Sequence, residues 1–144
     1  MTIIRTVVGL SIINEQTTML ALLKTANTIL YCRNWQATVD FYQNRLALPV
    51  HFASDWFVEF SLTGTSRLSI ADERSASVKS AGGQGITLAL EVADIRTAHR
   101  WAENAGLAPT ALRRHPWNAE VFYLRDPEGH RIEFWQATAE KTAS

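Results

Sequence analysis

The sequence contains a single cysteine, Cys32, and has no excess of charge, since 14 basic residues balance 14 acidic ones. One cysteine excludes an internal disulfide bond and a cysteine-rich zinc site. Because Cys32 lies in an apolar, strand-like run, we expect it to pack as a small buried side chain. A neutral chain has no electrostatic preference for nucleic acid or for an anionic membrane, and we expect neither as a partner.

The sequence also lacks an uninterrupted apolar run long enough to span a membrane. Its first twenty residues, MTIIRTVVGLSIINEQTTML, are broken by Arg5 and Gly9, and no small-residue cleavage site follows them. We therefore predict neither a signal peptide nor a membrane helix there. With the lone cysteine, this favours a cytoplasmic protein. Residues 1–23 are interpreted as an appendage with room for one extra strand, and Met19 as an alternative start.

What the sequence does have is an internal repeat. At 144 residues, with 47% hydrophobic and 19% charged residues, it suits one soluble domain with a hydrophobic core. At a shift of 60, residues 29–49 (ILYCRNWQATVDFYQNRLALP) fall on residues 89–109 of the segment 88–109 (LALEVADIRTAHRWAENAGLAP), so that Pro49 falls on Pro109. The later parts of the two halves align at a shift of 64. The matched order of elements supports a duplicated domain more strongly than the few identities do.

Each half is predicted to contain a strand, a helix and three further strands. The helices are expected over roughly residues 35–46 and 95–105, each capped by the residue before it, Asn34 or Asp94. Within the connection between the halves, GGQG lacks the strand–turn–helix context of a nucleotide-binding loop and is interpreted as a flexible link. The predicted segments are an N-terminal extension (1–23), a first module (24–72), a Ser/Gly-rich linker (73–85), a second module (86–137) and a C-terminal tail (138–144).

Alternation along the strands sorts the side chains into two faces. Leu30, Cys32, Ile132 and Phe134 are predicted to pack on the helices. The opposite faces carry polar and aromatic groups, which suit a small-molecule cleft better than a dry core. An exposed sheet face or a dimer contact is the alternative. The candidate ligand-binding residues are Tyr31, Trp56, Phe57, Arg67, Trp117, Tyr123, Arg131, Glu133 and Trp135.

Three segments resemble the vicinal oxygen chelate superfamily, which includes glyoxalase I, extradiol dioxygenases and the fosfomycin- and bleomycin-resistance proteins. They are NTILYCRNWQATVDFYQNRLAL, ITLALEVADIRTAHRWAENAG and FYLRDPEGHRIEFWQ. The last resembles the closing Asp-Pro-x-Gly turn of the family, followed by a strand that ends in glutamate. The resemblance covers about residues 25–136. It implies an α+β fold of two tandem βαβββ modules around a half-open, barrel-like cleft, and a homodimer.

Enzymes of this family hold one divalent metal with His, Gln or Glu from the first and last strands of each module. Those positions fall on Asn27, Ser69, Thr87 and Glu133. Only Glu133 is a usual ligand, and one carboxylate with an amide and two hydroxyls makes a poor site for zinc, nickel, manganese or iron. We therefore expect a degenerate metal site and no cofactor. A non-standard site that combines His51 or His115 with Glu133 and Glu91 is the alternative.

The resemblance and the missing ligands together favour a metal-free small-molecule binding protein like those of the bleomycin-resistance branch. Trp117, beside Pro116 in a loop, is a candidate for stacking on a planar ligand. A divalent-metal-dependent lyase, isomerase or dioxygenase of the glyoxalase type is the alternative, and a non-catalytic interaction domain is a third interpretation. Whether the chain catalyses a reaction stays open. We expect Arg67 or Arg131 to neutralise Glu133 in the cleft.

Overall fold

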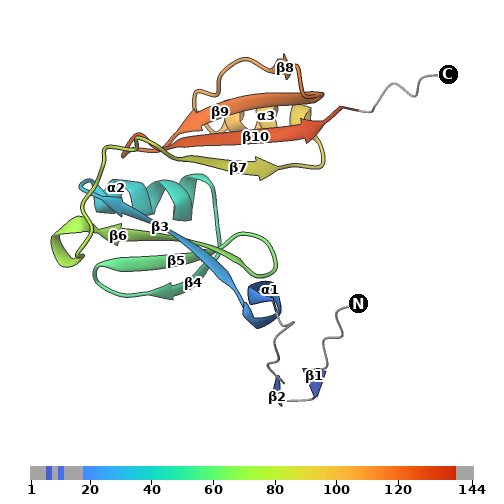
Figure 1. The fold of residues 1–144 in the computed structure, drawn as a ribbon. Helices are drawn as coiled ribbons and strands as arrows, with labels where there is room; N and C mark the ends of the chain where they lie inside the picture. Colours follow the sequence, from blue (N-terminus) through green and yellow to red (C-terminus); the bar gives the residue numbers. More distant parts are fainter. Residues whose placement is uncertain (1–5, 8–9, 12–17, 139–144) are drawn as a thin grey trace.

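The computed structural model describes residues 6–7, 10–11 and 18–138, which form two βαβββ modules in tandem (Figure 1). The first module consists of β3 (Ala26–Cys32), α2 (Trp35–Asp40), a π-helical turn η1 (Phe41–Arg45), β4 (Val50–Ala53), β5 (Phe57–Ser61) and β6 (Ser66–Asp72). A short 3-10 turn η2 (Glu73–Ser75) opens the connection. The second module consists of β7 (Thr87–Glu91), α3 (Ile95–Asn104), β8 (Arg113–His115), β9 (Ala119–Arg125) and β10 (Arg131–Ala137).

The two sheets have the same strand order. Sheet 1 runs β3-β6-β5-β4 and sheet 2 runs β7-β10-β9-β8. In each, the first and last strands of the module pair in parallel and the remaining neighbours are antiparallel. The predicted duplication and α+β class are confirmed, because a helix crossover is what brings a first strand parallel to a later one. The sheets do not close into a barrel.

The helices begin where the sequence predicts, but only one is capped as predicted. Asp94 accepts hydrogen bonds from the backbone N–H groups of Arg96 and Thr97, both at 3.1 Å. Asn34, in contrast, makes no side-chain cap to α2. The Glu128 carboxylate instead holds the chain just before the helix, accepting the N–H groups of Arg33 and Asn34 at 2.8 Å each. This prediction was wrong because Asn34, with φ −97° and ψ 61°, lacks the extended backbone that Asp94 has, and its side chain accepts no N–H group of the first turn of α2.

The two modules share one hydrophobic core. Leu30, Cys32 and Ile132 are buried as predicted, and Phe134 packs against them. Burial raises the pKa of the Cys32 thiol to about 12, with a further contribution from the nearby Glu128 carboxylate. The thiol is therefore an inert packing group, as expected.

The modules meet through their apolar faces. In Figure 1, α2 lies between the two sheets. A small cavity of about 110 Å³ lies at this contact. Its lining includes Tyr42 of η1 and Leu46 just after η1, together with Leu88, Leu90 and Phe134 of sheet 2. Since the apolar faces are used in this contact, the polar face of each sheet points away from the shared core.

The N-terminal segment differs from the single extra strand allowed by the sequence. Its described residues form two short strands, β1 (Thr6–Val7) and β2 (Leu10–Ser11), which pair with each other, and one helical turn, α1 (Met19–Leu22). The other residues of this segment, and the end of the predicted C-terminal tail, lie outside the described residues. Within the described part of the chain, no helix is both long and apolar enough to cross a membrane.

Candidate functional site

The polar face of sheet 1 carries a connected group of hydrogen-bonding side chains. The hydroxyl of the buried Ser69 donates to the Asn27 amide oxygen at 2.8 Å, and the Asn27 amide nitrogen lies 3.4 Å from Glu59. Glu59 also lies 3.6 Å from both Arg67 and His51. Two of the four predicted metal positions are therefore hydrogen-bonded to each other, and Glu59 links them to Arg67 and His51.

The polar face of sheet 2 carries a cation and a row of rings. Arg131 donates from Nε to the Thr87 hydroxyl at 2.9 Å, and its guanidinium carbon lies 4.7 Å from the centre of the Tyr123 ring. The Tyr123 hydroxyl lies 3.3 Å from Nε2 of His115. Such an arginine–tyrosine contact places the positive charge over the face of the ring, where the ring quadrupole attracts it.

An aromatic cluster continues this face. The Trp117 ring lies 5.6 Å from the ring of His115 and 5.6 Å from that of Trp135. Trp117 is 52% exposed, whereas Trp135 is half-buried. An exposed indole held by two ring neighbours has a preset orientation and a free surface, which are the properties that stacking on a flat ligand requires.

Glu133 lies on the same face, opposite Tyr123 on β9 and Ala89 on β7. We expected Arg67 or Arg131 to neutralise it. Instead Arg67 pairs with Glu59, and Arg131 is held by Thr87 and Tyr123. The expectation was wrong, and within the described residues this half-buried carboxylate forms no ion pair.

The remaining candidate residues belong to sheet 1. Tyr31 and Phe57 both flank the buried Ala71 in the strand register, and both are half-buried. The Trp56 ring stands edge-on to Phe57 at 5.5 Å. The candidates thus fall into two groups, one on each polar face. Among the described residues, no hydrogen bond, ion pair or ring contact joins the two groups.

The predicted metal positions do not fit a transition-metal site. The Asn27 oxygen and the Ser69 hydroxyl are engaged with each other on sheet 1, and the Thr87 hydroxyl accepts from Arg131 on sheet 2. The donors offered are one amide, two hydroxyls and the Glu133 carboxylate, which is a weak set for zinc, nickel or iron.

The alternative metal set is not assembled in this chain either. His51 contacts Glu59 on sheet 1, whereas His115 contacts Tyr123 on sheet 2. Within residues 18–138 and the two short N-terminal strands, no group of three His, Cys, Asp or Glu side chains could hold a metal ion. The proposed combination of either histidine with Glu133 and Glu91 is therefore not found.

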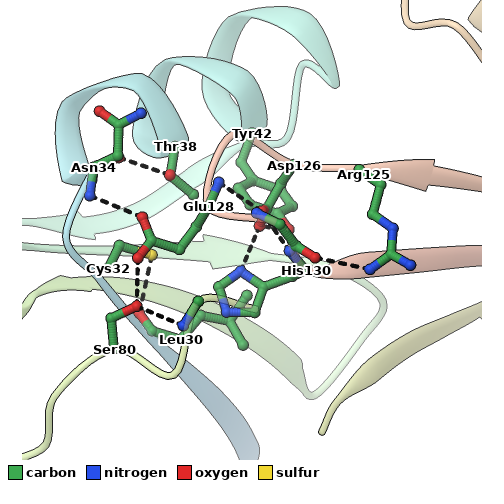
Figure 2. A network of polar contacts seen from close by, with 12 residues as sticks. Leu30, Cys32, Asn34, Thr38, Tyr42, Ser80, Arg125, Asp126, Glu128 and His130 are labelled. Carbon is green, nitrogen blue, oxygen red and sulfur yellow. Dashed lines mark hydrogen bonds and ion pairs between the residues drawn. The ribbon is translucent and has the colours of Figure 1, made fainter. Parts of the chain in front are cut away.

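A buried polar network at the 126–130 turn was read from the sequence only as a turn (Figure 2). One oxygen of Asp126 accepts the backbone N–H groups of Glu128, Gly129 and His130 at 2.9–3.0 Å. Its other oxygen lies 2.8 Å from the Tyr42 hydroxyl and 2.8 Å from Nδ1 of His130. Burial opposes ionisation of Asp126, but the hydrogen bonds from His130 and Tyr42 outweigh it and hold the pKa below its usual range.

Glu128 extends this network to the first module. Besides accepting the Arg33 and Asn34 N–H groups before α2, it accepts a hydrogen bond from the Ser80 hydroxyl in the connection. Burial opposes its ionisation too, yet the bonds from Ser80 and from the Arg33 and Asn34 backbone lower the pKa. The turn therefore acts as a polar clamp between the modules. The sequence signal for it was Asp-Pro-Glu-Gly-His, but its partner Tyr42 is 84 residues away.

Comparison with known proteins agrees with this architecture. The family model described as "Glyoxalase/Bleomycin resistance protein/Dioxygenase superfamily" matches residues 22–134. The chain belongs to this superfamily. No curated protein shows a significant match to the sequence.

Solved structures of the superfamily share the fold at low identity. A glyoxalase/bleomycin resistance protein/dioxygenase from Nocardioides is 19% identical, with a TM-score of 0.69 over 85% of this chain and 88% of that one. Lactoylglutathione lyase from Agrobacterium tumefaciens is 20% identical, with a TM-score of 0.63 over 78% and 92%. A bleomycin resistance determinant encoded on the transposon Tn5 is 17% identical, with a TM-score of 0.64 over 81% and 100%. At these identities the likeness concerns the fold.

Proposed function

We propose that this superfamily member is a metal-free small-molecule binding protein, and that the polar face of sheet 2 is its principal binding surface. The observation that carries the proposal is the exposed Trp117 ring, held between His115 and Trp135 on a face that also presents Glu133. The fold shared with a bleomycin resistance determinant supports a binding role. The poor donor set at the metal positions argues against a resident transition metal.

The chemistry of this face defines the class of ligand. The indole rings of Trp117 and Trp135 offer apolar area for a flat heteroaromatic group. Glu133, which has no ion-pair partner within the described residues, favours a positive charge or hydrogen-bond donors on that group. The ligand expected here is therefore planar and cationic at its stacking end.

We further propose that the protein is a homodimer. Both polar faces point away from the shared core of one chain, so each is only one wall of a cleft. The face of sheet 1 carries exposed apolar side chains, Ile29 at 37% and Phe52 at 54%. Covering them with sheet 2 of a second copy would bury this apolar area and place Tyr31, Phe57 and Trp56 opposite Trp117. A cytoplasmic location, where a lone thiol stays reduced, is consistent with this proposal.

The test is a binding titration followed by tryptophan fluorescence, with bleomycin and the planar cationic dye proflavine as probes. Trp117→Ala should weaken binding about five- to twelvefold, the loss of a stacking contact worth about 1–1.5 kcal/mol. It should leave the melting temperature nearly unchanged, because the side chain is half exposed. Trp101→Ala is the matched control, since Trp101 is a similarly exposed tryptophan, at 46%, on α3. Equal affinity of the two variants for both probes would refute the assignment.

A second measurement tests the metal-free part of the proposal. The purified, untagged protein is incubated with nickel, zinc, manganese and ferrous iron, and its metal content is determined after desalting. We expect far less than one ion per chain for each metal. Near-stoichiometric retention that Glu133→Gln abolishes would favour the other candidate function, a metal-dependent lyase, isomerase or dioxygenase of the glyoxalase type.

A further inference from the structure

A second cavity lies at the other end of sheet 2, where the connection between the modules enters β7. It has a volume of about 570 Å³ and is lined by residues 82–87 together with Arg125, Gly129 and Arg131. Among the residues that the structure describes, none with an acidic side chain lines it. The two arginines give the cavity a positive charge, and none of the ligand-face rings described above contributes to its walls.

The two arginines are direct cross-strand neighbours. Arg125 on β9 and Arg131 on β10 are paired in the antiparallel register, so both side chains leave the sheet on the same face. Like charges placed directly opposite each other destabilise a sheet. Within the part of the chain that the structure describes, neither arginine pairs with a carboxylate. The repulsion is therefore uncompensated by the described protein groups, and an anion in the cavity would relieve it.

Both guanidinium groups are anchored by neutral acceptors. Arg125 donates from Nη1 to the Gly129 carbonyl at 2.9 Å, and Arg131 donates from Nε to the Thr87 hydroxyl at 2.9 Å. Each anchor uses one edge of the guanidinium and leaves further N–H groups for a ligand. Two fixed guanidinium forks side by side match the oxygens of a phosphate or a carboxylate.

The glycine-rich wall of the cavity allows close approach of a ligand to the backbone. Gly83 is explained by packing, since a Cβ there would lie 2.2 Å from the carbonyl carbon of Gly129. Gly82 and Gly85 also have positive φ, at 66° and 80°, but a Cβ on either would meet nothing within 4 Å. At these two positions the space that a side chain would fill is open, so the backbone is accessible from the cavity side.

We infer that this cavity is a binding site for a small oxyanion, either a phosphate or a carboxylate group, held by Arg125, Arg131 and the 82–87 turn. The inference does not depend on the proposed stacking ligand. Arg131 also borders the ligand face through Tyr123, so an anionic group here can belong to the same ligand or to a separate one. The paired arginines, rather than any single side chain, define the site.

The test is isothermal titration calorimetry with inorganic phosphate and, in a parallel arm, succinate, at constant ionic strength set with chloride. We expect saturable binding of at least one of them, with one anion per chain. Arg125→Gln should weaken it at least about tenfold, as expected for loss of a charge-assisted contact. Arg114→Gln, an exposed arginine on β8 outside the cavity, is the matched control and should bind as the wild type does. Binding of phosphate alone or of succinate alone assigns the chemical class.

Two further comparisons keep this test separate from that of the stacking ligand. Trp117→Ala should lose affinity for proflavine and keep its affinity for the oxyanion, whereas Arg125→Gln should do the reverse. If Arg125→Gln does not fold, Arg125→Lys keeps the charge but loses the fork, and should bind the anion more weakly than wild type. The inference is wrong if neither anion binds saturably at millimolar concentration, or if the Arg125 variants bind like the Arg114→Gln control.

Discussion

The Tyr42→Phe substitution isolates one hydrogen bond in the clamp between the modules. Tyr42 is 1% exposed, and its hydroxyl donates to Asp126 at 2.8 Å. Its ring packs edge-on against Phe41 at 5.1 Å, a contact that phenylalanine retains. Burial and the neighbouring Asp126 carboxylate raise the pKa of Tyr42, so the hydroxyl stays a donor over the whole working range of pH. The variant therefore removes one donor from a buried carboxylate and little else.

The expected loss of stability follows from the charge on the acceptor. A hydrogen bond to a charged group contributes about 1.5–3 kcal/mol, so about 2 kcal/mol is expected at neutral pH. An entropy of unfolding of about 2.1 cal/mol/K per residue over the 144-residue chain converts this into a fall in Tm of about 6 °C. The Asp126 oxygen keeps its contact with His130, which prevents a larger loss.

The pH dependence distinguishes this bond from simple packing. Because the folded pKa of Asp126 is depressed, its stabilisation is complete above the unfolded value of about 3.9 and is lost as the pH falls through the folded pKa. Besides Tyr42, the titratable groups around the carboxylate are His130, Glu128 and Cys32, and all are present in both proteins. The difference in stability between wild type and variant should thus be largest at neutral pH and shrink below pH 4.

Thermal unfolding followed by circular dichroism, from pH 7 down to pH 2, checks this. Tyr31→Phe is the control, since the half-buried Tyr31 hydroxyl has no hydrogen-bond partner among the described residues and its loss should leave Tm unchanged. A Tyr42→Phe protein as stable as wild type at pH 7 would refute the reasoning. So would a stability difference that stays constant through the titration of Asp126.

Two other substitutions test how the fold is held together. Gly83→Ala should lower the free energy of unfolding by about 3 kcal/mol or more, because its Cβ would clash with Gly129 and because φ is left-handed at 81°. Gly82→Ala, with open space around it, should lower it by only about 1 kcal/mol. Urea unfolding of the two variants decides whether the contact with Gly129 matters. Asp94→Ala should lower Tm by a few degrees, because it removes the side-chain cap of α3. Asn34→Ala removes no cap and should leave Tm unchanged. Equal effects of the two substitutions on Tm would contradict the capping assignment.

The architecture was predictable because its signal is local and appears twice. Apolar residues at every second position, such as Leu30 and Cys32, predict one face of a strand. Apolar residues spaced three or four positions apart predict one face of a helix in the same way. The repeat then supplied the order of elements, and the parallel pairing of β3 with β6 and of β7 with β10 follows from the crossover helix. Periodicity and chain order agree here, which is why the order of elements could be derived from one sequence, whereas the arrangement of the two modules was implied by the family resemblance.

The capping error shows where local rules stop. Asn34 is an acceptable N-cap by residue type, and the alignment with Asp94 made the two helices look equivalent. In the structure, however, Asn34 does not adopt the extended backbone of a side-chain cap, and Glu128 of the second module accepts the N–H groups of Arg33 and Asn34, just before α2. No periodicity or motif reports a contact between residues 94 apart in the chain.

The ion pairs on the polar faces were also beyond what local sequence rules predict. Strand alternation placed Arg67, Glu133 and Arg131 on polar faces. It did not predict which charged side chains contact each other. Arg67 meets Glu59 rather than Glu133 because the register of β5 and β6 places Arg67 and Glu59 on neighbouring strands of sheet 1, whereas Glu133 lies on sheet 2. Arg125 and Arg131 are six positions apart on either side of a turn, so they become neighbours only through the register of β9 and β10. This register places two cations opposite each other, and none of the described carboxylates pairs with them, which destabilises the sheet of the isolated chain. That destabilisation is the reason to look for an anion there.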